Sequence, residues 1–207
     1  MRRKSVTIIP LRTALIGLLG VAIVVGGLWT WLNRGAQTRI EIYNPAGFNA
    51  TEEVDGTCFT GSLAAQRAGA FRCSAGNSLF DPCFSLDDNV ACPVDDPAAN
   101  AGVLIQLTSP LPQPPEAWEN DPDPAKPQPW YLKLAGGGVC GVLTGTRPSP
   151  DFPLGCSIPS ADAPTYCSEP VALEQSDGAY ITVCGVFDSE TREIINRQAY
   201  VVEEMWL

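Results

Sequence analysis

The chain has 207 residues, with 13 basic and 23 acidic side chains, 8 cysteines, no histidine and a formal net charge of −10. This length allows one domain, or one domain with an anchor, and the acidic charge argues against nucleic acid or anionic lipid as a ligand. Without histidine, the chain can form neither a nucleophile–histidine pair nor a histidine-ligated zinc, haem, copper or iron site.

The N-terminal segment predicts a membrane anchor. Residues 1–13 form a basic tail, and residues 14–32 (ALIGLLGVAIVVGGLWTWL) carry no charge. At a rise of about 1.5 Å per residue, this stretch nearly crosses a hydrocarbon core of about 30 Å. The basic residues before it favour a cytoplasmic N-terminus. We therefore expect a single-pass protein of the cell membrane with residues 33–207 on the extracytoplasmic (periplasmic) side; a cleaved signal peptide is the alternative.

The cysteines predict disulfides. All of them follow the predicted span, and no two have C-x-x-C spacing. An even number confined to the exported side is typical of disulfides, not of a thioredoxin-type redox centre or a zinc ribbon. The sequence permits on the order of 100 pairings, among which short loops favour Cys83–Cys92 and Cys156–Cys167. The predicted disulfide cysteines are Cys58, Cys73, Cys83, Cys92, Cys140, Cys156, Cys167 and Cys184.

The first half of this exported part predicts few regular elements. Alternation over residues 38–43 indicates a short strand, and the apolar residues 103–107 indicate another. Residues 62–71 (SLAAQRAGAF) are rich in helix formers and predict a short helix. Residues 110–129 contain eight prolines, which exclude a helix or a central strand and predict an extended, polyproline-like surface loop.

The second half predicts strands. Residues 130–134 and 139–143 read as a hairpin that turns at three glycines, 136–138. Residues 180–187 indicate a buried strand and residues 197–206 a final one. The expected fold is a mainly β, disulfide-stapled extracytoplasmic domain with long Pro-rich loops and one short helix, carried on a single N-terminal transmembrane helix.

Several motifs occur in a fixed order along the chain: C-x-T-G-S at 58–62, R-C at 72–73, G-N-x-x-x-D-P-C-F at 76–84, W-x-L-x-L at 130–134, then C at 140 and G-T at 145–146. This pattern resembles a family of uncharacterised bacterial secreted or membrane-anchored, disulfide-rich domains. The resemblance covers residues 58–146 and implies an exported, disulfide-bonded fold without naming an activity. Cys156, Cys167 and Cys184 lie beyond it.

The D-P-C-F motif predicts a tight, disulfide-stapled turn built by Asn77, Asp81 and Pro82. A residue that precedes proline avoids the helical region, and the Asp81 carboxylate can cap nearby backbone amides. Asn77 tolerates the left-handed backbone of a turn. A binding or catalytic role for Asn77 and Asp81 is the alternative interpretation.

Other candidate chemistries lack a distinguishing pattern. A serine–lysine pair would need Lys126, in the proline-rich loop, or Lys133, between strand leucines. A pair of carboxylates for glycoside hydrolysis could come from many acids, and no feature selects one pair. We therefore expect no catalytic residue, no metal ligand and no cofactor. Trp118, within the proline-rich loop, and Trp130, after it, are the candidates for contact with a partner protein.

These observations predict a non-catalytic, membrane-anchored ectodomain that acts as an accessory or stabilising subunit of a larger membrane-protein complex. A respiratory or photosynthetic complex is one candidate. Glycines in the span favour close helix packing against partner subunits. Two alternatives remain open: a stand-alone exported ligand-binding or sensor domain, and a carboxylate-based hydrolase.

Overall fold

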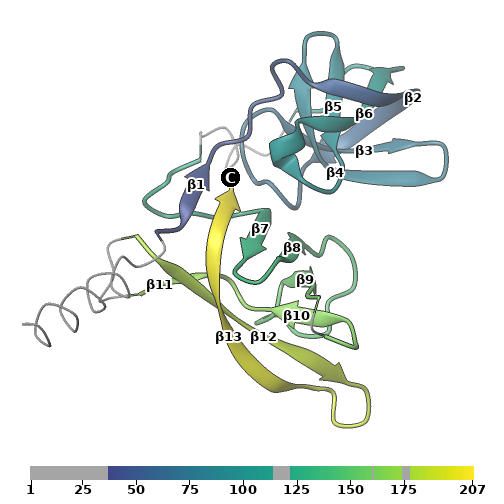
Figure 1. Cartoon of the computed structure of the whole chain (residues 1–207). Helices are drawn as coiled ribbons and strands as arrows, with labels where there is room; N and C mark the ends of the chain where they lie inside the picture. The colour runs from purple at the N-terminus through teal and green to yellow at the C-terminus, as the bar shows by residue number, and fades with distance from the viewer. Residues whose placement is uncertain (1–36, 114–121, 160, 174–177) are drawn as a thin grey trace, which may run out of the picture. The chain divides into compact units, whose positions relative to one another are not determined.

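The computed structural model describes residues 37–113, 122–159, 161–173 and 178–207 (Figure 1). The predicted anchor, residues 14–32, lies outside them. Within the described residues, no helix is both long enough and apolar enough to cross a bilayer. The described chain is mainly β, as predicted, and its one helical element is the short 3-10 helix η1 (Pro97–Ala99).

The first half forms a closed five-stranded barrel. Neighbouring strands pair antiparallel, except that the first and the last run parallel where they close the barrel. The strands approach closely at Gly56: a Cβ there would lie 2.5 Å from the Ser74 carbonyl oxygen, so a larger residue does not fit. The strands are β2 (Asn49–Gly61), β3 (Ala70–Ala75), β4 (Ser78–Leu86), β5 (Asn89–Pro93) and β6 (Ala101–Leu107).

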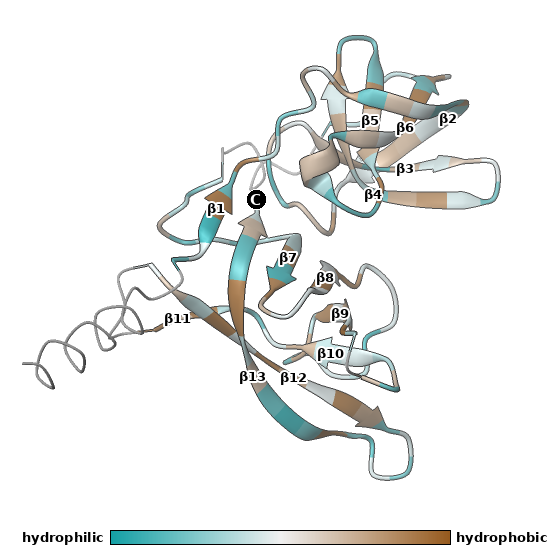
Figure 2. Cartoon of the chain, in the orientation of Figure 1, coloured by the Kyte–Doolittle hydropathy of each residue, from teal (hydrophilic) through white to brown (hydrophobic). Residues whose placement is uncertain are grey.

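The second half forms an eight-stranded sheet in the order β1-β13-β7-β8-β9-β10-β12-β11. The long strand β13 also pairs with β12, so that six of the strands form a closed circuit. Figure 2 shows hydrophilic and hydrophobic stretches alternating along β13, which agrees with its partly exposed course. The strands are β1 (Arg39–Glu41), β7 (Tyr131–Leu134), β8 (Gly138–Val142), β9 (Leu154–Ser157), β10 (Thr165–Cys167), β11 (Val171–Ala172), β12 (Tyr180–Asp188) and β13 (Glu193–Trp206).

Aromatic side chains from both halves share one apolar cluster. Trp130 lies with its ring centroid 5.9 Å from that of Tyr43, 5.7 Å from that of Phe84 and 6.0 Å from that of Tyr131. Phe84 comes from the barrel strand β4, whereas Tyr43 follows β1 and Trp130 precedes β7. Ring packing of this kind buries large apolar areas, so the cluster ties the barrel to the sheet.

All eight cysteines form disulfides. The pairs are Cys58–Cys73, Cys83–Cys92, Cys140–Cys156 and Cys167–Cys184. Each links two neighbouring antiparallel strands: three pairs are directly opposite in the register, and Cys83–Cys92 continues the β4–β5 register by one position. The predicted pair Cys83–Cys92 is confirmed. The predicted pair Cys156–Cys167 is wrong, because the residue opposite Cys156 on β8 is Cys140.

The predicted helix at residues 62–71 is also wrong. Residues 62–69 form a loop, and β3 begins at Ala70. The hydroxyl of Ser62 accepts hydrogen bonds from the amides of Ala64 and Ala65, which resembles a helix N-cap. The chain then turns away at Gly69, whose φ is +71°. The turn therefore never propagates into a helix.

The predicted strands of the second half are confirmed. The hairpin of β7 and β8 pairs Leu132 with Cys140, and the strands predicted at 180–187 and 197–206 correspond to β12 and β13. The strands predicted at 38–43 and 103–107 correspond to β1 and β6. The described parts of the proline-rich loop, 110–113 and 122–129, contain neither helix nor strand.

Burial of Tyr43 makes stability sensitive to alkaline pH. Desolvation raises the pKa of its phenol from 10.0 to about 12, although the positive charge of Arg67 opposes the rise. An unfolded tyrosine ionises near pH 10, so ionisation stabilises the unfolded chain first. We expect the stability that Tyr43 contributes to be complete below pH 10 and lost as the pH rises toward 12. Denaturant unfolding from pH 8 to 11.5, with Tyr43→Phe as control, measures this; equal pH slopes for both proteins would contradict it.

Candidate functional site

A cleft of about 190 Å³ lies between the loop that follows β2 and the loops of the sheet. Eight of its twelve lining residues are apolar, four of them prolines, but polar atoms make up most of its exposed surface. Four long polar side chains (Gln66, Gln128, Arg147 and Glu169) supply hydrogen-bonding groups. The remaining lining residues are Leu63, Ala64, Pro127, Pro129, Val142, Pro153, Leu154 and Pro170.

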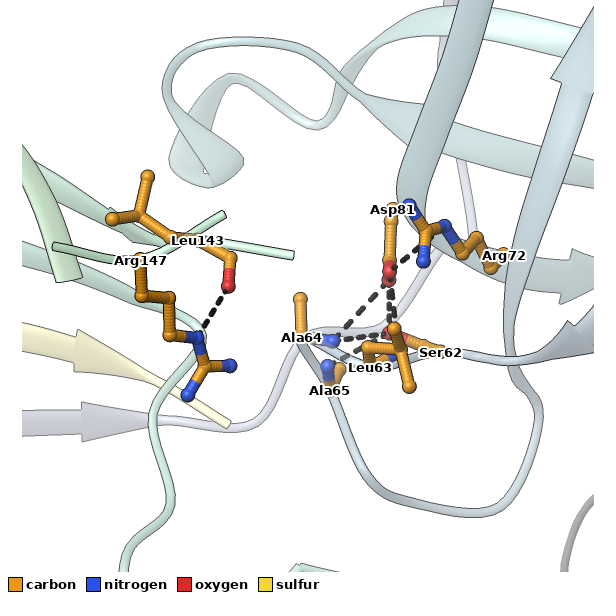
Figure 3. A network of polar contacts seen from close by, with 8 residues as sticks. All are labelled: Ser62, Leu63, Ala64, Ala65, Arg72, Asp81, Leu143 and Arg147. Carbon is orange, nitrogen blue, oxygen red and sulfur yellow. Dashed lines mark hydrogen bonds and ion pairs between the residues drawn. The ribbon is translucent and has the colours of Figure 1, made fainter. Parts of the chain in front are cut away.

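The β2 loop forms one wall because Asp81 holds it (Figure 3). The Asp81 carboxylate accepts a hydrogen bond from the hydroxyl of Ser62 and from the amides of Leu63, at 3.2 Å, and Ala64, at 3.3 Å. Its side chain is only 4% exposed. A buried carboxylate needs such donors to replace water. The loop backbone is thus fixed by a side chain 17 to 19 positions further along the chain.

Arg72 balances the charge of this carboxylate. Its Nε lies 3.8 Å from Oδ2 of Asp81, which is an ion pair without a direct hydrogen bond. The two residues come from the neighbouring barrel strands β3 and β4. The buried charge of Asp81 is therefore compensated by a side chain of the neighbouring barrel strand, which leaves this carboxylate in a positioning role beside the cleft.

Arg147 stands on the other wall. Its Nε donates to the carbonyl oxygen of Leu143 at 2.9 Å, which fixes the root of the guanidinium (Figure 3). The side chain is exposed, and none of the ion pairs between described residues involves it. Its terminal nitrogens can therefore bind an external carboxylate in a two-pronged arrangement.

Together, the walls suit an extended peptide. Prolines and aliphatic side chains supply the smaller, apolar part of the surface, and the amides of Gln66 and Gln128 can pair with the backbone of a bound strand. The volume of about 190 Å³ is below the roughly 300–1,000 Å³ typical of sites that enclose whole small molecules. The geometry therefore favours a segment of a macromolecule over a free metabolite.

The residues of the D-P-C-F motif are not one turn. Asn77 lies in the turn between β3 and β4, whereas Asp81 and Pro82 lie within strand β4. The prediction of a turn at Asp81–Pro82 is therefore wrong. Asp81 nevertheless accepts hydrogen bonds from backbone amides, as its residue type suggested.

Trp130 is not available to a partner. It is 5% exposed and packs inside the aromatic cluster, so its predicted role at a partner interface is wrong. Trp118 lies outside the described residues. Lys126 lies in the described end of the proline-rich loop, and Lys133 lies on β7.

Lys133 belongs to a charge network and not to the cleft. Its Nζ lies 2.9 Å from Oδ2 of Asp96 and 3.3 Å from Oε2 of Glu204. The hydrogen bond with Asp96 raises the pKa of Lys133, against the opposing effect of burial. A lysine that stays protonated is a poor general base, so this geometry disfavours the serine–lysine pair considered above.

The cleft residues Gln66, Arg147 and Glu169 carry no sequence signal that could have singled them out. They come from three separate loops and meet only in the folded chain. Ser62 is different, because it ends the C-x-T-G-S motif. Its hydroxyl organises the loop at the edge of the cleft.

Replacing Asp81 with alanine is expected to lower the free energy of unfolding by about 2–3 kcal/mol, because two amides, a hydroxyl and Arg72 lose a charged acceptor. Asp81→Asn keeps one acceptor oxygen and should lose less. Urea unfolding measures both variants. Amide exchange at Leu63 and Ala64 should accelerate in Asp81→Ala, and unchanged exchange there would contradict the positioning role.

Comparisons with models of protein families, with curated proteins and with solved structures find no match for the chain. The family resemblance inferred from the D-P-C-F pattern therefore stays a prediction.

Proposed function

We propose that the protein is a non-catalytic, exported binding module, anchored by residues 14–32, which serves as an accessory or stabilising subunit of a membrane-protein complex. Residues 37–207 would hold an extended extracytoplasmic segment of the partner in the cleft between the β2 loop and the sheet. The observation that carries the proposal is the state of the cysteines: all eight form cross-strand disulfides.

The disulfides support export. Structural disulfides persist in oxidising compartments and are rare in the cytosol. Four of them in a chain that also has substantial apolar clusters indicate a rigid scaffold. A rigid scaffold lowers the entropic cost of binding a flexible segment, which suits a stabilising subunit.

The charge of the cleft supports the choice of occupant. Residues 37–207 contain 8 basic and 23 acidic side chains, a formal charge of 8 − 23 = −15. Against this acidic background, the cleft lining contains one exposed cation, Arg147, together with one carboxylate, Glu169. We infer that the bound segment is extended and carries an acidic side chain that pairs with Arg147.

Copurification from native membranes tests the proposal. The full chain and its Arg147→Ala variant would be purified in mild detergent after brief cross-linking, and the recovery of each copurified partner would be quantified. Loss of a charge-assisted hydrogen bond worth about 1.5–3 kcal/mol corresponds to a loss of affinity of about tenfold or more. We therefore expect partner recovery to fall strongly in Arg147→Ala.

Arg192→Ala is the matched control, because it removes the same charge from the turn between β12 and β13, outside the cleft lining. It should leave partner recovery unchanged. Equal recovery with all three proteins would contradict the role of the cleft, and a lone band of the detergent-extracted protein on a native gel would contradict the subunit role.

A further inference from the structure

Two disulfides lie next to each other in the sheet. Cys140–Cys156 joins β8 to β9, and Cys167–Cys184 joins β10 to β12. Strands β9 and β10 are direct neighbours, and Cys167 is opposite Leu154, two positions from Cys156. Because side chains alternate between the faces of a strand, Cys156 and Cys167 project from the same face of the sheet.

The sulfur atoms of the two disulfides are in contact. The Sγ atom of Cys156 lies 2.8 Å from that of Cys167, and the Sγ atom of Cys140 lies 3.9 Å from it. Thiol–disulfide exchange requires a thiolate to reach a sulfur of another disulfide. Here the two sulfurs need approach by only about 0.8 Å to reach the bond length of about 2.0 Å.

The four cysteines differ in access to solvent. Cys140, Cys167 and Cys184 are at most 2% exposed, whereas Cys156 is partly exposed. An external thiol therefore meets Cys140–Cys156 first, and Cys167–Cys184 is shielded.

We propose that these two disulfides form an exchange site that accepts electrons from an external dithiol and ends with a Cys156–Cys167 bond. One thiolate of the dithiol attacks Sγ of Cys156, forms a mixed disulfide and expels the thiolate of Cys140. The second thiol of the dithiol then attacks the other sulfur of the same dithiol, which is bonded to Cys156. This releases the thiolate of Cys156 and leaves the dithiol oxidised to a disulfide.

The internal step follows. The Cys156 thiolate attacks Sγ of Cys167, the Cys167–Cys184 bond breaks, and Cys184 leaves as a thiolate that takes up a proton, as Cys140 does. In total, two electrons and two protons pass from the dithiol to the protein. Cys156–Cys167 has formed, and Cys140 and Cys184 are thiols.

The two new thiols stay near each other. The Sγ atom of Cys140 lies 3.9 Å from that of Cys167, which is bonded to the Sγ atom of Cys184 at 2.00 Å before the exchange. The sulfurs of Cys140 and Cys184 are therefore at most about 6 Å apart. The two-thiol form needs an external oxidant to close a bond between them, because joining two thiols removes two electrons.

Limited reduction of the full chain tests the exchange. Dithiothreitol would be added in small steps to the native protein, and each sample quenched with acid and a maleimide before peptide mapping. We expect the first new cross-link to be Cys156–Cys167, with the maleimide on Cys140 and Cys184. Reduction that leaves Cys167–Cys184 intact while Cys140 and Cys156 are both alkylated would overturn the proposal.

A variant tests the internal step without a reductant. Cys140→Ser frees Cys156 beside Cys167–Cys184, and we expect Cys156–Cys167 to form while Cys184 becomes the alkylated thiol. The control Cys58→Ser frees Cys73 in the barrel, where no contact between sulfurs of different disulfides occurs among the described residues. In the control, Cys73 itself should be alkylated, and alkylation of Cys156 in Cys140→Ser would overturn the proposal.

Discussion

Reduction of all four disulfides is expected to unfold residues 37–207 at 25 °C. The bridges close loops of 9 to 17 residues. Closing a loop of this length stabilises the fold by about 3 kcal/mol, because the bridge restricts the unfolded chain. Four such terms sum to about 12 kcal/mol, which is comparable with the whole net stability of a typical domain, about 5–15 kcal/mol. Circular dichroism with excess dithiothreitol measures the loss.

A single bridge provides the graded control. The double variant Cys58→Ala/Cys73→Ala opens a loop of 15 residues and should cost about 3 kcal/mol in the free energy of unfolding while the fold persists. If the fully reduced protein kept a cooperative thermal transition near that of the oxidised protein, the disulfides would not be structural.

Replacing Trp130 with alanine is expected to cost about 3–5 kcal/mol. Trp130 packs against Tyr43, Phe84 and Tyr131, so the substitution opens a cavity in the cluster that ties the barrel to the sheet. The cleft should weaken as well, because its walls come from both halves. Urea unfolding measures the loss of stability. We expect the barrel and the sheet to lose stability together.

Trp130→Phe separates packing from polarity at the same position. The indole Nε1 of Trp130 is buried and has no hydrogen-bond partner among the described residues. Phenylalanine keeps most of the ring and removes this unpaired donor, so it should cost much less than alanine. Equal losses for the two variants would show that ring packing is not what holds the cluster.

The alternation of apolar and polar residues along the chain made strands of the eight-stranded sheet predictable from the sequence. In β7, Leu132 and Leu134 are fully buried and flank Lys133, and the apolar run of β12 is bounded by turn residues. Such local patterns need no knowledge of partner strands. The barrel lacked this signal: β2 (NATEEVDGTCFTG) contains three acids and two glycines, and its place in a sheet comes from closure against β6.

The helix prediction failed for a tertiary reason. Asp81, from outside the local chain, accepts hydrogen bonds from the amides of Leu63 and Ala64, and Gly69 then turns the backbone toward β3. Intrinsic helix propensity is worth only tenths of a kcal/mol per residue. A buried carboxylate with three donors outweighs it.

The cysteine pairing needed the strand register. Sequence distance favoured Cys156–Cys167, but the directly opposite partners are Cys140 for Cys156 and Cys184 for Cys167. The cleft could not be predicted from the sequence either, because Gln66, Arg147 and Glu169 meet only in the folded chain. Residue types predicted the number and oxidised state of the cysteines, and only the topology assigned their partners.

Alkylation of the protein in intact cells tests the central claim most directly. Cells would be quenched with acid to freeze thiol exchange, denatured in maleimide without reductant, and the chain analysed by intact mass and peptide mapping. A protein that matures in an oxidising compartment should carry no maleimide and should yield the peptides Cys58–Cys73, Cys83–Cys92, Cys140–Cys156 and Cys167–Cys184. A chain with all of its cysteines alkylated would contradict both the disulfide-stapled fold and the exported location.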